Sequence, residues 1–192
     1  MILVDDYKNV INSMLHPTAA TKKTMDIGAS MVYFWKGAAI PFVLLLIEVL
    51  AIGGIVTAAL SAVLSSLSTV PGLGAIITAG LAVFVIVYYL ILAPIGILVD
   101  AVIFQVFGQY IFRFFKKGFK NTVSAFSYGA TAAMSMIWLG PLFFLSAIWG
   151  FVVEVLALAN QQSISWLKSL GTIVLTSIII WVIVFLLRLV GL

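Results

Sequence analysis

Charged side chains are scarce in this chain of 192 residues, because 8% of the residues are charged whereas 64% are hydrophobic. A water-soluble domain of this length has far more charged surface. Lipid must therefore surround most of the chain, and we predict a polytopic integral membrane protein. A backbone in hydrocarbon must satisfy its own hydrogen bonds, so the expected fold class is an all-α helical bundle. A transmembrane barrel is excluded, since runs such as 173–187 are apolar on every side instead of alternating.

Cysteine is absent, and His16 is the only histidine. Thiol chemistry, disulfides and cysteine-based metal sites are therefore impossible, and a serine nucleophile would lack an obvious histidine base in the membrane. The sequence also has no GxSxG, HExxH, GxxxxGK[ST] or GxGxxG motif. We expect no catalytic residue, no metal site and no cofactor, and hence a protein that is not an enzyme.

Five apolar stretches follow a more polar start. Residues 1–30 predict an N-terminal amphipathic helix and connector, which either lies along the membrane interface or packs on the protein. The transmembrane domain is expected to fill 31–192, with spans at about 37–67, 75–112, 124–139, 143–159 and 170–187. The second stretch is long enough for two spans broken at Pro94, which would give six helices instead of five.

The positions of the basic residues favour five spans. Short cytoplasmic loops collect Lys and Arg, and five spans place the loop cations on one side. The N-terminus is then cytoplasmic, and the C-terminus lies outside or in a lumen. The cytoplasmic basic loop consists of Arg113, Lys116, Lys117 and Lys120. Because a break at Pro94 would move this loop to the opposite face, we predict that Pro94 kinks one overlong helix. Membrane ends account for the net charge of +4, so no nucleic acid is expected as a partner.

Small residues recur every four positions in the first span and form two adjacent stripes. The stripes are Gly53, Thr57 and Ser61, and Gly54, Ala58 and Ala62. Such stripes allow helix backbones to approach closely. Two interpretations stay open: a hairpin with the second span, turning near residues 71–74, or an interface with a partner protein or a second copy of the chain.

Glu48, Asp100 and Glu154 are acids within the predicted spans, and intramembrane ionisable residues are costly enough to nominate functional positions. Glu48 and Asp100 are equally far from residue 74, so a turn there predicts that they lie level on antiparallel helices and could share a proton. Lys36 is a competing partner for Asp100 if the hairpin slips by about one turn. A proton or cation relay, a neutral packing pair and a contact with a partner subunit all remain open.

Residues in the loops and predicted helix ends of the second half of the chain match a pattern found in other membrane proteins. The matching positions are Pro94, Ile95, Gly118, Phe119, Lys120, Thr122, Tyr128, Gly129, Ala130, Thr131, Ile148, Trp149, Gln162, Ile164, Ser165 and Lys168. Over this region the chain resembles the Yip family, integral membrane proteins named for interaction with Ypt and Rab GTPases. Phe114 and Phe115 stand where the family often has paired glycines, and the compact form is similar to prokaryotic members. The resemblance implies five helices, a cytoplasmic N-terminus and, as a family property, a small GTPase partner.

We therefore expect a non-enzymatic integral membrane scaffold or accessory subunit. Its expected surroundings are the lipid bilayer and a membrane protein partner or a second copy of the chain. The alternative is a small transporter, or a proton- or cation-conducting protein, that uses buried Glu48 and Asp100.

Overall fold

A computed structural model describes residues 8, 10–12, 15–64, 73–135, 137–138 and 143–189. Every regular element in this part of the chain is helical: α2 (Pro17–Ala20), α3 (Ile27–Leu64), α4 (Leu73–Val87), α5 (Ala93–Val106), α6 (Phe119–Met134), α7 (Phe143–Gln162) and α8 (Trp166–Leu189). Four of the described helical stretches, 27–55, 75–111, 143–162 and 166–189, are long and apolar enough to cross a membrane. The all-α fold is therefore confirmed, and it has the form of a multi-pass membrane protein.

Helix α3 begins at Ile27, ten residues before the predicted first span. The cause is a helix cap, since the Ala29 backbone N–H donates a hydrogen bond of 2.7 Å to Asp26 Oδ1. An aspartate at this position satisfies an N–H group that has no partner within the helix. The first turns of α3 are thus part of the folded bundle, and Phe34 is fully buried there.

The second predicted span is one continuous helix with two irregular turns. Two π-helical segments, η1 (Tyr88–Leu92) and η2 (Phe107–Ile111), follow α4 and α5 directly. Pro94 lies in the first turn of α5, and its neighbours Leu92 and Ala93 keep helical dihedral angles. A π-helical turn is a common way to accommodate a local disturbance of the helical hydrogen bonds. The prediction that Pro94 lies within one long helix is confirmed, and the alternative with a break there is wrong.

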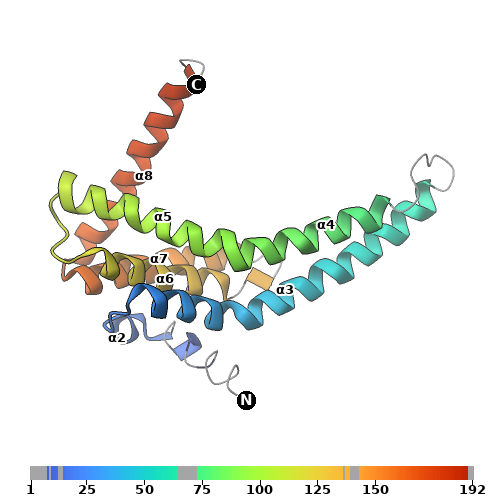
Figure 1. Cartoon of the computed structure of the whole chain (residues 1–192), viewed down its shortest axis with the longest axis horizontal. Coiled ribbons are helices and arrows are strands. Elements are labelled where there is room, and N and C mark those ends of the chain that lie inside the picture. The colour runs from blue at the N-terminus through green and yellow to red at the C-terminus, as the bar shows by residue number, and fades with distance from the viewer. Residues whose placement is uncertain are drawn as a thin grey trace.

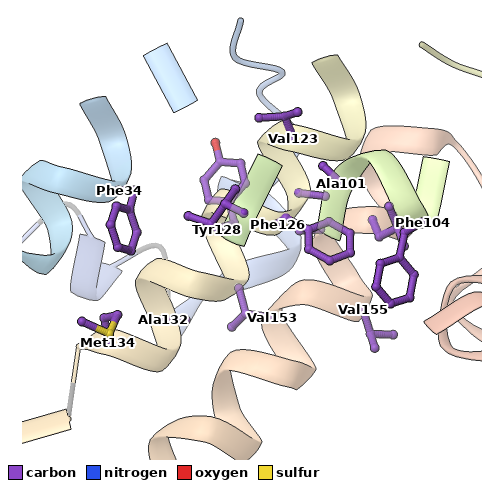
Figure 2. Close-up of a cluster of buried hydrophobic side chains, with 14 of the residues drawn as sticks. Phe34, Ala101, Phe104, Val123, Phe126, Tyr128, Ala132, Met134, Val153 and Val155 are labelled. Carbon is purple, nitrogen blue, oxygen red and sulfur yellow. The ribbon is translucent and has the colours of Figure 1, made fainter. Parts of the chain in front are cut away.

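Helix α6 is the centre of the bundle and packs against α3, α5 and α7. Twelve of its sixteen residues are buried. Figure 2 shows the surrounding apolar cluster, in which Phe104 of α5 lies beside Phe126 of α6 and Phe34 of α3 lies at the other side of the cluster, beyond Tyr128. The small residues of α6 therefore serve internal packing.

Two parts of the fold extend away from this bundle (Figure 1). Helices α3 and α4 continue as a two-helix hairpin, and α8 leaves at an angle toward the C-terminus. In α8 the buried residues are confined to the first half: Ser169, Thr172, Ile173 and Thr176. Every residue from Trp181 to Leu189 is exposed.

The N-terminal segment packs on the bundle at Val10, which is 2% exposed. A Cβ added to Gly37 of α3 would lie 2.8 Å from Val10 Cγ2, so this side chain fills the space above the glycine. Pro17 occupies the first turn of α2, where a missing N–H is harmless, instead of only ending the preceding helix pattern. Residues 1–7, 9, 13 and 14 of the predicted amphipathic helix lie outside the described residues.

Candidate functional site

The α3–α4 hairpin fixes which intramembrane acids can meet. The rings of Phe42 and Tyr89 stack at 4.2 Å between centroids, so these two residues are level. Glu48 lies six residues from Phe42 toward the hairpin tip, whereas Asp100 lies eleven residues from Tyr89 in the opposite direction. At 1.5 Å per residue, about 25 Å along the hairpin separates them. The predicted Glu48 and Asp100 pair is therefore wrong.

The predicted turn was placed too late in the chain. Helix α4 already begins at Leu73, so Gly74 is helical and does not form a turn. Farther from the bundle, Gly53 of α3 packs against Thr78 of α4, which gives the same register as the Phe42 and Tyr89 pair. The hairpin prediction holds, but the centre of the turn comes earlier than residue 74.

The structure brings Asp100 together with Glu154, across α6. The rings of Phe104 and Phe126 lie 5.0 Å apart between centroids and fix the antiparallel register of α5 and α6. Asp100 lies about one turn farther from the basic loop than Phe104 on α5. Gly129 lies about one turn farther from that loop than Phe126 on α6. A Cβ added to Gly129 would lie 2.6 Å from the Cβ of Glu154. Asp100 and Glu154 therefore lie at about the same level along the bundle, on either side of Gly129, which has no side chain.

This arrangement places two acidic side chains at about the same level within candidate membrane spans. Asp100 is exposed and Glu154 is partly buried. Two carboxylates in such a place can hold a proton or a cation between them. The described residues contain no group of three His, Cys, Asp or Glu that could hold a metal ion.

Lys36 of α3 is exposed and lies closer in level to Asp100 than Glu48 does. It is six residues before Phe42, so about 7 Å along the helix axis separates it from the level of Asp100. Glu48 is partly buried near the middle of the hairpin. Of the four predicted intramembrane polar residues, only Asp100 and Glu154 come together as a pair of acids.

The two small-residue stripes of α3 have different surroundings. Gly53 faces α4, because a Cβ there would collide with the side chain of Thr78. A Cβ added to Gly54 would meet nothing within 4 Å. Gly53 thus packs the hairpin, and Gly54 faces away from it. The side chains of Thr57, Ala58, Ser61 and Ala62 lie outside the described residues.

A network of buried amide side chains, which the sequence interpretation missed, closes the end of the bundle near the basic loop. Gln162 of α7 donates a hydrogen bond of 2.9 Å to Thr122 Oγ1 and accepts one of 2.9 Å from the Lys117 backbone N–H. Thr122 in turn donates to Gln105 Oε1, and Gln105 Nε2 donates to the Lys117 carbonyl at 3.1 Å. These bonds tie α5, α6, α7 and the basic loop together.

A second set of amides fastens the N-terminal connector. Gln161 Nε2 donates to the carbonyls of Thr21 and Lys23 at 2.5 and 3.0 Å, and Gln161 Oε1 accepts from Thr24 Oγ1 at 2.7 Å. Asn121 Nδ2 donates to the Gln161 carbonyl at 3.0 Å. The signal in the sequence was the run Asn160, Gln161 and Gln162 at the end of an apolar stretch, since amides there must find partners.

No family model matches the chain, and neither a curated protein nor a solved structure matches it. The resemblance to the Yip family therefore stays a prediction that depends on its quoted residues. Three of those residues take part in the polar contacts described above: Thr122 and Gln162 share the amide network, and Gly129 packs against Glu154.

Proposed function

We propose that this chain is a non-enzymatic membrane scaffold or accessory subunit that binds another membrane protein along α8. The supporting observation is the outer half of α8, in which the whole circumference from Trp181 to Leu189 is exposed. Helices associate in lipid through close van der Waals packing, and the exposed side chains of this half leave room for such packing. A partner helix would supply it.

The angle between α7 and α8 supplies a place for such a helix. A groove of about 340 Å³ lies there, and its lining residues are Phe151, Ile173, Val174, Ser177, Ile178, Trp181 and Val182. The lining is almost wholly apolar, which suits a lipid-embedded side-chain contact better than a polar ligand. We infer that a partner's apolar side chains enter this groove.

The proposed topology has five crossings, with α6 as the short central one. Because protein covers α6 on several sides, α6 can cross with Ser and Thr side chains that lipid-facing helices rarely carry. The N-terminus is then cytoplasmic, and the C-terminus lies outside or in a lumen. The Yip resemblance supports the same topology and the role of a partner-binding membrane protein, with a small GTPase as a partner by family resemblance.

Photo-crosslinking in native membranes tests the partner proposal. A photoreactive amino acid at Val182, on the groove, should give one discrete protein adduct, because a bound helix lies within a few ångströms of that position. The adduct is identified by mass spectrometry. The matched control is the same amino acid at Val83, which is 59% exposed on α4 and faces away from the bundle. Adducts to lipid alone at Val182, or identical protein adducts at both positions, would contradict the proposal.

A second candidate function is supported by the nearness of Asp100 to Glu154. If these acids relay protons or cations, the pair Asp100→Asn with Glu154→Gln should reduce flux into proteoliposomes by about tenfold or more, because no carboxyl group then remains at that level. Ion-sensitive dyes measure the flux. Glu48→Gln is the matched control, since it also neutralises an intramembrane acid but lies far along the hairpin. Equal flux in all variants, or none in the unaltered protein, would contradict a relay.

A further inference from the structure

The loop between η2 and α6 forms an exposed basic surface with no nearby acid in the sequence. Arg113, Lys116, Lys117 and Lys120 are all exposed there. No Asp or Glu occurs between residues 100 and 154. Lys168, at the start of α8, joins the surface, because its Nζ lies 5.4 Å from the centroid of the Phe114 ring. Five cations thus belong to one end of the bundle.

The loop backbone is held in place from the inside. The N–H groups of Phe114 and Phe115 donate to the Gly108 carbonyl at 2.8 and 3.0 Å. The Lys117 N–H and carbonyl bond to Gln162 and Gln105. The loop therefore turns its charged side chains outward from a fixed backbone. A preorganised surface loses less conformational entropy when it binds a ligand.

Aromatic side chains place this surface at the edge of the bilayer. Tyr110, three residues before Arg113, is 68% exposed, and Trp166, two residues before Lys168, is 55% exposed. The rings of Phe112 and Phe114 stack 6.0 Å apart. Exposed Tyr and Trp side chains concentrate at the level of lipid headgroups. The cations of the loop are therefore expected at the level where phosphate groups of lipids are found.

We propose that the basic loop, residues 113–120 together with Lys168, binds the headgroups of anionic phospholipids. Gln105 and Gln162 act as positioning residues that hold the loop in its binding geometry. Charge complementarity, the fixed backbone and the aromatic edge together favour a lipid over a soluble acidic protein, which would not use the exposed Tyr110 and Trp166. The proposal is independent of the scaffold and transporter functions.

Native mass spectrometry of the full chain in mixed micelles tests the proposal. The probes are phosphatidylglycerol and phosphatidylcholine with identical acyl chains. The unaltered protein should retain phosphatidylglycerol in preference, and Lys116→Glu with Lys117→Glu should reduce that preference by about tenfold or more, since each cation near a lipid surface contributes to the attraction. The matched control is Lys22→Glu with Lys23→Glu, which changes the net charge equally and lies outside the loop.

The positioning role is tested by Gln162→Leu, which leaves every charge in place but releases Lys117. The preference of this variant for phosphatidylglycerol should also fall, because the loop backbone is held less firmly. If the number of charges alone decided binding, the preference would not change. If this variant does not fold, the lysine pair and its control still decide the proposal. Equal retention of the two lipids, equal loss in both lysine variants, displacement by millimolar inorganic phosphate, or stronger displacement by an acidic peptide would each overturn it.

Discussion

Gly129→Leu is expected to lower the stability of the protein in detergent by about 3 kcal/mol or more, because overpacking a tight interface costs about 1–3 kcal/mol and more where backbone must move. A Cβ at this position would lie 2.6 Å from the Cβ of Glu154 and 3.1 Å from its Cα. The Cα belongs to the backbone of α7, so a change of side-chain rotamer cannot relieve the collision. Helices α6 and α7 must move apart, and thermal unfolding followed by tryptophan fluorescence measures the loss.

Gly54→Leu is the control for Gly129→Leu. Both substitutions put the same side chain into a helix, but a Cβ at Gly54 would meet nothing within 4 Å. Leucine is a better helix former than glycine, so we expect a change within about 1 kcal/mol, in the stabilising direction. Equal destabilisation by the two variants would show that the contact between Gly129 and Glu154 is looser than the structure has it.

The helices could be predicted from the sequence because long apolar runs leave few alternatives to membrane-crossing helices. The start of α3 was missed although its signal was present, since Asp26 is a suitable cap residue before the first turn. The direction of α8 could not be predicted. Ser169, Thr172 and Thr176 mark the packed face in the first half of α8, but residues 181–187 are apolar on every side and contain no polar stripe that shows where the outer half points.

The acids were recognised as unusual, but their partners were not predictable from spacing along the chain. In an antiparallel hairpin, each residue of error in the centre of the turn shifts the partner by two residues, which is about 3 Å. A turn centred near residue 74 therefore paired Asp100 with Glu48, although Tyr89 is level with Phe42. Glu154 reaches Asp100 through α6, and only the three-dimensional packing of three helices reveals that relation.

Gln161→Leu should release the N-terminal connector from α7 and cost about 1–3 kcal/mol of stability, because a buried polar group left without a partner costs that much. The substitution removes the acceptor of Thr24 and the donor to the carbonyls of Thr21 and Lys23. The buried Thr21 carbonyl loses its partner, whereas the Lys23 carbonyl keeps the Tyr128 hydroxyl and Thr24 Oγ1 keeps Asn121 Nδ2. Hydrogen–deuterium exchange of residues 21–26 should therefore rise together with the loss of stability.

Gln109→Leu is the control for Gln161→Leu, because it also removes an amide side chain but one that does not hold the connector. Gln109 is exposed on η2 and accepts a single hydrogen bond of 2.5 Å, from Gln105 Nε2, which keeps a second acceptor in the Lys117 carbonyl. Its replacement should cost less than about 1 kcal/mol and leave exchange in the connector unchanged, because no buried group loses its last partner. If exchange of residues 21–26 were the same in both variants and in the unaltered protein, the connector would not depend on Gln161. The attachment would then come from Asn160, whose Nδ2 donates to the Thr18 carbonyl and to Thr21 Oγ1 at 3.2 and 2.9 Å.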